Sequence, residues 1–305
     1  MKGGNEFSKN VMSPETEAWI VKLHKSLVLK DYGNGTIKSY TAEMTLLFKY
    51  HWQKPVNEIR QADVEQYLLY IKEVHKVGRA KCRSVAQACS YFFKKVMQVP
   101  YIVPSNLYPK KQFILPNIMS EEQVQKLIDT PTLNLKEQCV VGILYGSGLR
   151  ISELCTLRVK DIESSEKRIK VVQGKGAKDR YTLLPDTIVE QLRSYYVACG
   201  RPKEFLFTSK QTGRAHHVRS MQVVVNNAMD KAGFKGQSYT AHTLRHSFAT
   251  HLLNQGCNIH VIKTLLGHSK IETTMIYLHL QKHTQLGIVS PLDQLKIKGD
   301  DTKPE

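Results

Sequence analysis

Three segments of the sequence hold arginine, histidine and tyrosine residues at spacings that suit chemistry on a phosphate group. GSGLRISEL places Arg150 after a Gly-Ser-Gly turn at the start of a predicted helix. TAHTLRHSFATHLL places His242 and Arg245 three residues apart, on one face of a predicted helix with Thr240 as its N-cap. LLGHSKIETTMIYLHL has His268 directly after a glycine and Tyr277 nine residues later. Arginine binds phosphate through two parallel hydrogen bonds, and histidine and tyrosine can carry protons or act as nucleophiles.

A fourth segment, GKGAKD, joins two predicted strands and carries Lys175 between two glycines. Glycines on both sides let the tip of such a hairpin approach another backbone closely, for example within a DNA groove. Taken alone, each of these residues also fits a structural role: an arginine can cap a helix, a lysine can be a solvated tip, and a tyrosine can pack in a core. Their combination is what indicates a site.

His242 and His246 also have the i, i+4 spacing of a zinc-binding helix. The HExxH motif needs a glutamate after the first histidine, however, and Thr243 occupies that position. No carboxylate or cysteine pair supplies the remaining ligands, so the sequence predicts neither a metal site nor another cofactor.

The four segments together resemble the tyrosine recombinase family, also called the phage integrase family. The resemblance is carried by GLR within G-x-G-L-R-x-S-E-L, the GKG lysine, H-T-L-R-H-S-F-A-T-H, and L-L-G-H followed by the tyrosine of T-T-M-I-Y-x-H. It spans about 120 to 281 and is looser over 14 to 98, where only size and helical pattern match. The six matching residues are Arg150, Lys175, His242, Arg245, His268 and Tyr277.

The resemblance implies a chemistry for each of these residues. Tyr277 would attack a DNA phosphodiester and form a 3′-phosphotyrosyl link, while the two arginines stabilise the charge that grows on the phosphate. The two histidines would serve as further donors or proton carriers, and Lys175 would protonate the leaving 5′ oxygen. Because the link conserves the energy of the broken bond, a second DNA hydroxyl can reseal the strand without metal or ATP.

The implied function is that of a site-specific DNA recombinase or integrase acting on double-stranded DNA with inverted core sites. The resemblance also implies a homotetramer on paired DNA sites. Beyond Tyr277 lies an apolar stretch broken by Pro291, which either folds back on its own subunit or, as the resemblance favours, docks on the next protomer. Its apolar residues are Leu286, Ile288, Val289, Leu292 and Leu295.

Other functions fit part of the sequence. A type IB topoisomerase shares the chemistry, but the compact two-domain chain favours a recombinase. A non-catalytic DNA-binding protein would explain the charge without the six residues, and a metal-dependent hydrolase fits least well. The task that strand exchange serves (integration, excision, cassette exchange or dimer resolution) depends on the DNA site and on partners.

Composition agrees with a DNA-binding enzyme. The chain has 305 residues, 44 lysines and arginines against 27 aspartates and glutamates, and a formal net charge of +17. Cations that neutralise phosphates gain affinity through counterion release, so the charge favours a nucleic-acid partner over a basic surface that serves only solubility. Six dispersed cysteines and the lack of a signal-peptide pattern predict a cytoplasmic protein. No apolar run approaches the ~20 residues of a membrane span.

The first half of the chain has the pattern of a helical bundle. Ser13-Pro14 predicts the start of a helix that runs to about Lys30, and a Gly-Asn-Gly sequence at 33 to 35 predicts the break that ends it. Three further segments within 37 to 96 repeat apolar residues every 3.6 positions. We therefore expect a four-helix bundle over 13–98, and the resemblance implies that it is a core-binding domain. Four prolines predict a linker over 99–118.

The second half predicts a mixed α/β catalytic domain, mainly helical, over 119–297, followed by a polar tail over 298–305. A capping box, Ser120 to Gln123, opens it, and helices are expected over 121–129 and 134–147. RIKVVQ and RYTLL, residues 168–173 and 180–184, predict two strands of a small antiparallel sheet, and FLFTS predicts another short strand. The expected fold class is mostly α.

Overall fold

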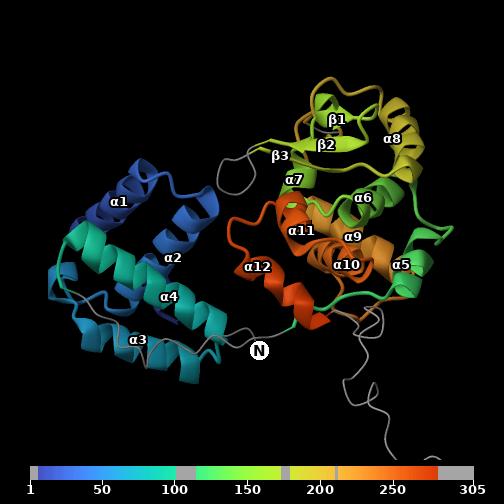
Figure 1. The fold of residues 1–305 in the computed structure, drawn as a ribbon. Helices are drawn as coiled ribbons and strands as arrows, with labels where there is room; N and C mark the ends of the chain where they lie inside the picture. The colour runs from blue at the N-terminus through green and yellow to red at the C-terminus, as the bar shows by residue number, and fades with distance from the viewer. Residues whose placement is uncertain (1–5, 101–114, 173–178, 210–211, 281–305) are drawn as a thin grey trace, which may run out of the picture. The chain divides into compact units, whose positions relative to one another are not determined.

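The amphipathic segments of the first half form four α-helices in a computed structural model, which describes residues 6–100, 115–172, 179–209 and 212–280 (Figure 1). The helices are α1 (Pro14–Leu29), α2 (Asn34–Tyr50), α3 (Gln61–Glu73) and α4 (Arg79–Tyr91). Two 3-10 segments, η1 (Glu6–Lys9) and η2 (Val56–Glu58), precede α1 and α3, and a π-helical segment, η3 (Phe92–Met97), continues α4.

Helix starts in this half follow from local chemistry. The hydroxyl of Ser13 accepts the backbone N–H of Thr16 at 3.2 Å, and Pro14 takes the first helical position, as predicted. The predicted end of α1 near Lys30 is confirmed, because α1 ends at Leu29 and Lys30 is its C-cap. The Gly-Asn-Gly sequence, however, does not itself end the helix. The first helix ends before it, and Gly33 is the N-cap of α2, so this sequence begins a helix.

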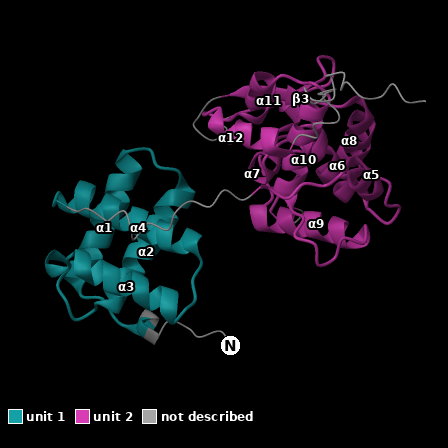
Figure 2. Cartoon of the chain, turned by 60° about the horizontal axis from the view of Figure 1, so that its bottom comes forward, with its two compact units in different colours: residues 1–113 teal, residues 114–305 magenta. Residues whose placement is uncertain are grey.

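The core of the first half is built from the inward faces of all four helices. Met44, Leu47 and Phe48 of α2 are buried against residues of α1 and α4. One carboxylate lies inside: Glu43 is buried and accepts a hydrogen bond from Lys81 Nζ at 2.6 Å. The predicted four-helix bundle is confirmed, and it forms one of two compact units, residues 1–113 and 114–305 (Figure 2).

The second unit is also mainly helical. The capping box that opens it is confirmed, because Ser120 Oγ accepts the N–H of Gln123 at 3.2 Å and Gln123 Oε1 accepts the N–H of Ser120 at 2.9 Å. Its α-helices are α5 (Glu121–Ile128), α6 (Leu135–Gly146), α7 (Ile151–Cys155), α8 (Asp186–Ala198), α9 (Val218–Lys231), α10 (Ala241–Asn254), α11 (Ile259–Leu266) and α12 (Glu272–Met275), with 3-10 segments η4 (Val159–Asp161) and η5 (Ile276–Leu280).

This unit also contains a small antiparallel sheet. It has the order β1 (Ile162–Glu163), β2 (Arg168–Val171) and β3 (Arg180–Leu183), with Ile169 opposite Thr182. The two predicted strands are therefore confirmed, and β1 adds a short third one. The hairpin tip, with Lys175, lies outside the described residues.

The strand predicted for FLFTS is wrong. Phe205 and Thr208 each form one isolated bridge, to Arg158 and Ala215, without a continuous ladder. Leu206 and Phe207 are buried in the core of the unit, so the apolar run reflects side-chain burial of an irregular segment.

The C-terminal helices of the unit share a separate apolar cluster. Phe248 and Leu253 of α10 pack with Ile262 and Leu266 of α11 and with Tyr277. Figure 1 shows α10, α11 and α12 next to one another. The observed fold is mostly helical with a small antiparallel sheet, as predicted. None of the helices in the described ranges is both long and apolar enough to span a bilayer.

Candidate active site

Arg150 is held at the start of α7 by a glutamate three residues later. Arg150 is the N-cap residue, and its backbone N–H donates to Glu153 Oε2 at 2.8 Å. Its guanidinium Nη1 donates to Glu153 Oε1 at 2.7 Å. The preceding turn needs glycine, because Gly148 has φ +61° and a Cβ there would overlap the ring of Phe248.

Glu153 binds a second arginine that comes from the sheet. Arg180, on β3, donates from Nη1 and Nη2 to the two carboxylate oxygens at 2.9 and 2.7 Å. Burial alone would raise the pKa of Glu153, but the hydrogen bonds and charges of Arg180 and Arg150 outweigh it and lower the pKa to about 2. The carboxylate is therefore ionised at any working pH. It also lies 3.9 Å from Nη1 of Arg245, so it connects α7, β3 and α10.

Arg245 is buried in the middle of this network, with 4% of its surface exposed. Its guanidinium donates to the carbonyl oxygen of Gly148 and, at 2.6 Å, to that of Leu266. Burial and the charge of Arg150 lower the pKa of Arg245 to about 10, although Glu153 opposes the shift. The side chain remains a cation at neutral pH, in a fixed orientation.

His268 is a neutral acceptor in this arrangement. Arg245 Nη2 lies 3.2 Å from His268 Nε2, and because a guanidinium can only donate, Nε2 is the unprotonated nitrogen. Nδ1 then donates to the hydroxyl of Thr274 at 2.9 Å. Burial, followed by the charges of Arg245 and Arg150, lowers the pKa of His268 to about 3.

The turn before His268 depends on Arg180 as well. Gly267 ends α11 in the left-handed region, at φ +62°. A Cβ at this position would lie 2.7 Å from Cδ of Arg180, whose Nε donates to the carbonyl oxygen of Leu265 at 2.8 Å. The glycine lets the strand and the turn pack in contact.

Tyr277 lies in η5 and is 1% exposed. Its ring packs in the cluster with Phe248 and Leu266, and its hydroxyl lies 3.0 Å from Nδ1 of His246. Burial raises the pKa of Tyr277 to about 12, against the opposing charges of Arg245 and Arg150. The phenol is therefore protonated at neutral pH.

The two histidines at the start of α10 differ in exposure. His242 is exposed, and burial of part of its ring together with the charges of Arg245 and Arg150 lowers its pKa. His246 is half-buried, and its ring centroid lies 6.5 Å from that of His242.

The predicted N-cap position of Thr240 is confirmed. The hydrogen bond at this cap runs from the backbone N–H of Thr240 to the hydroxyl of Thr243, at 3.1 Å, and so the Thr240 residue is the donor.

Comparison with known proteins decides the family. The sequence profile described as Phage integrase family matches residues 117–284, and that of the phage integrase N-terminal SAM-like domain matches residues 19–102. A tyrosine recombinase of Pseudothermotoga lettingae is 34% identical over 251 residues, which cover 78% of this chain and 86% of that protein. The chain belongs to the phage integrase family of tyrosine recombinases.

Further relatives agree with this family. A tyrosine recombinase of Thermosipho africanus is 31% identical over 275 residues, covering 87% of this chain and 95% of that protein. Among solved structures, XerA recombinase has 27% identity and a TM-score of 0.52, over 90% of this chain and 96% of that one. XerH recombinase bound to a palindromic difH substrate, in a post-cleavage complex, has 18% identity and a TM-score of 0.68, over 93% and 99%. The last of these shows a shared fold.

Five of the six residues predicted from the sequence of this tyrosine recombinase gather in one region of the second unit. They are Arg150, His242, Arg245, His268 and Tyr277. Sequence reasoning missed Arg180 and the Glu153 carboxylate that joins the arginines, and it gave His246 only a rejected zinc role. Glu153 has the N-cap to N3 spacing of a capping box, which could have drawn attention to it.

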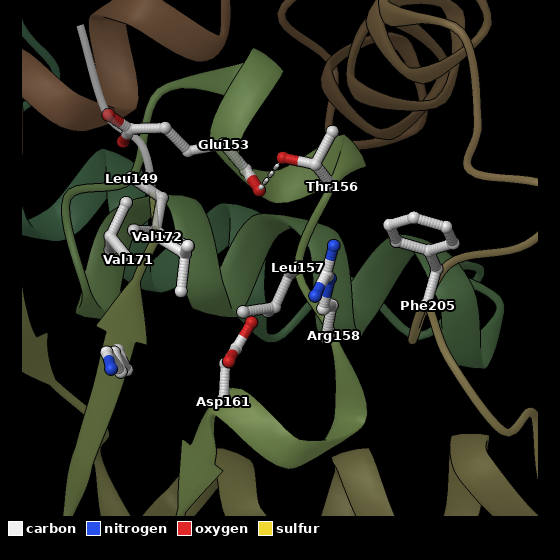
Figure 3. Close-up of a pocket in the computed structure, with 10 residues that line it drawn as sticks. Leu149, Glu153, Thr156, Leu157, Arg158, Asp161, Val171, Val172 and Phe205 are labelled. Carbon is white, nitrogen blue, oxygen red and sulfur yellow. Dashed lines mark hydrogen bonds between the residues drawn. The ribbon is translucent and has the colours of Figure 1, made fainter. Parts of the chain in front are cut away.

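A cavity of about 380 Å³ has Glu153 in its lining (Figure 3). Residues from α7, η4, β2 and the FLFTS segment line it, including Asp161 and Phe205. Thr156 Oγ1 donates there to the Glu153 carbonyl oxygen at 3.3 Å. None of the five gathered recombinase residues is in its lining. In the described part of the chain, no three His, Cys, Asp or Glu side chains are placed to hold a metal ion. The cavity and the cluster of arginines and histidines are therefore distinct features that share Glu153.

Replacing Glu153 with glutamine should strongly destabilise the recombinase, because buried guanidinium groups would lose their counter-charge. We expect Glu153→Gln to lower the free energy of unfolding by ~3 kcal/mol or more at pH 7. Urea denaturation followed by circular dichroism measures this. Since the pKa of Glu153 is lowered to about 2, the wild type gains stability above pH ~4.3 and loses it as the pH falls toward 2. The difference between the two proteins should shrink over that range.

Glu163 offers a matched control. It accepts a hydrogen bond from Arg168 at 2.6 Å, yet it is a partly exposed pair on the sheet. Glu163→Gln should cost about 1 kcal/mol or less. Equal losses in the two variants would contradict a special role for the Glu153 carboxylate.

Proposed function

We propose that Tyr277 is the nucleophile of this tyrosine recombinase, and that it cleaves DNA through a covalent 3′-phosphotyrosyl link. The observation that carries the proposal is the buried, fixed guanidinium of Arg245, which shares Glu153 with Arg150 and lies near enough to Tyr277 for the charges of both arginines to act on the phenol. Two cations of this kind can stabilise the charge of a phosphoryl transition state without a metal ion.

Each side chain has one part in the proposed step. Tyr277 Oη bonds to phosphorus, and the bond from phosphorus to the 5′ oxygen breaks with its electron pair going to that oxygen. A guanidinium has five N–H donors, so Arg245 keeps donors for the phosphate beyond those that bind the two carbonyl oxygens and His268 Nε2. His242 and His268 are the further donors or proton carriers, and Lys175 supplies the proton for the leaving oxygen.

The substrate we propose is double-stranded DNA with inverted core sites. The net charge of +17 favours a phosphate backbone, and the similar XerH recombinase was solved on a palindromic DNA substrate. Residues 13–98 would be the core-binding domain, 99–118 the linker, 119–297 the catalytic domain and 298–305 a polar tail. Cysteines that are free in the structure, such as Cys139 and Cys155, are compatible with action in the cytoplasm.

The test of the nucleophile is the variant Tyr277→Phe. The ring keeps its packing and only the hydroxyl is lost, so we expect normal DNA binding and no covalent adduct. Incubation with a nicked suicide DNA site in EDTA, followed by denaturing gel electrophoresis, measures the adduct. Tyr196→Phe, on α8, is the control and should form the adduct at the wild-type rate. Adduct formation by Tyr277→Phe would show that another residue is the nucleophile. If the wild type forms the adduct but exchanges no strands, topoisomerase activity would be favoured instead.

The role of Lys175 can be tested with a DNA substrate that carries sulfur in place of the leaving 5′ oxygen. If Lys175 protonates the leaving oxygen, Lys175→Ala should slow cleavage of ordinary DNA by about 100-fold or more. The same variant should recover on DNA whose bridging 5′ oxygen is replaced by sulfur, because a thiolate leaves without a proton. An equal defect on both substrates would exclude the general-acid role and direct attention to Lys178.

A further proposal concerns how copies of the chain assemble on DNA. We propose a monomer in free solution and a homotetramer on paired DNA sites. In this proposal the apolar stretch after Thr284, which lies outside the described residues, docks on the next protomer in a closed cyclic arrangement. Truncation after Thr284 should then leave single-site binding intact and abolish the pairing of two sites in a native gel. Pairing by the truncated protein would mean that this stretch packs on its own subunit.

A further inference from the structure

Tyr277 has an unassigned partner at its reactive atom. The hydroxyl lies 3.0 Å from Nδ1 of His246, within hydrogen-bonding distance, and the two ring centroids are 5.7 Å apart. His246 is the one hydrogen-bond partner of this hydroxyl among the described residues. None of the proposed roles so far uses His246.

A phenol that attacks phosphorus must lose its proton, and burial makes this harder here by raising the pKa of Tyr277. The nearby arginines cannot accept a proton, since a guanidinium has only donors. His268 has both ring nitrogens engaged, Nε2 by Arg245 and Nδ1 by Thr274. His246 Nδ1 is the group in contact that can receive a proton.

We propose that His246 is a catalytic residue, the general base that accepts the phenol proton of Tyr277 as Oη bonds to phosphorus. This inference rests on the proposed function of Tyr277 as the nucleophile. In the step, the Oη–H bond breaks and an Nδ1–H bond forms on His246. The new Oη–P bond replaces the bond from phosphorus to the 5′ oxygen, which keeps its electron pair and takes its own proton from the general acid. Resealing of the strand returns the proton from Nδ1 to Oη.

The surroundings of His246 keep it ready for this role. Burial, then the neighbouring His242 and Arg245, lower the pKa of His246 to about 4, so its ring is neutral and Nδ1 can hold a lone pair. A base this weak takes a proton from a phenol only as the bond to phosphorus forms. The positive charge then created lies near Arg245, which favours onward loss of the Nε2 proton toward His242 or solvent.

The helix fixes this geometry. His246 directly follows Arg245 on α10 and is four residues after His242, so His242 and His246 lie on one face of the helix. The same helix therefore presents a phosphate-binding cation and a proton acceptor beside the nucleophile. A shift of α10 would move both.

The experiment compares His246→Asn and His246→Leu in single-turnover cleavage of a nicked suicide DNA site. The amide oxygen of asparagine can occupy the place of Nδ1 and accept the hydrogen bond, but it cannot take up the proton. We expect both variants to form the adduct about 100-fold more slowly than the wild type. Replacing Tyr277 in each variant by 3,5-difluorotyrosine, a more acidic phenol, should recover most of the rate and should change the wild-type rate much less.

Controls separate this role from a structural one. His260→Asn, at an exposed position of α11, should cleave like the wild type, and DNA affinity and thermal unfolding should be measured for every variant. A rate for His246→Asn within a few-fold of the wild type would show that only the hydrogen bond matters and would overturn the inference. Faster cleavage by both variants, or no recovery with difluorotyrosine, would overturn it too. Adduct formation by Tyr277→Phe would instead refute the proposed nucleophile.

Discussion

The buried carboxylate of Glu153 compensates the positive charge that the rest of the site requires. Arg150 and Arg180 bind it directly and Arg245 lies 3.9 Å away, in a region from which water is largely excluded. Three guanidinium groups so close together would repel one another and lose hydration without a counter-charge. Because one carboxylate faces all three, α7, β3 and α10 can bring their arginines together.

Backbone geometry then sets the direction of the charges. Arg245 is oriented by the carbonyl groups of Gly148 and Leu266, which belong to the turn before α7 and to the end of α11. Gly148 and Gly267 adopt positive φ angles in places where a Cβ would meet Phe248 or Arg180. The turns are therefore part of the site: they supply acceptors for the arginine and bring the helix ends into contact.

At neutral pH Arg245 is charged, whereas His246, His268 and Tyr277 are neutral. The pKa values of His246 and His268 are lowered to about 4 and about 3, and that of Tyr277 is raised to about 12, with burial as the first cause in each case. An incoming phosphate would add negative charge beside Arg245 and favour protonation of the histidines. Substrate binding would in this way change the proton affinities on which the proposed transfer depends.

The sequence by itself determined the family, the mostly helical fold class, the helix starts at Ser13 and Ser120, the β2–β3 hairpin and the identity of five residues that gather in space. These follow from short motifs and local periodicity, which depend on neighbours within a few positions. Tertiary structure alone decided the pairing of Glu153 with Arg180, 27 residues apart, and of His246 with Tyr277, 31 residues apart. Nothing in the local sequence around either partner specifies such a contact, because it arises only when separate elements pack together. The same reason explains FLFTS, whose apolar residues are buried by the surrounding core without a strand partner.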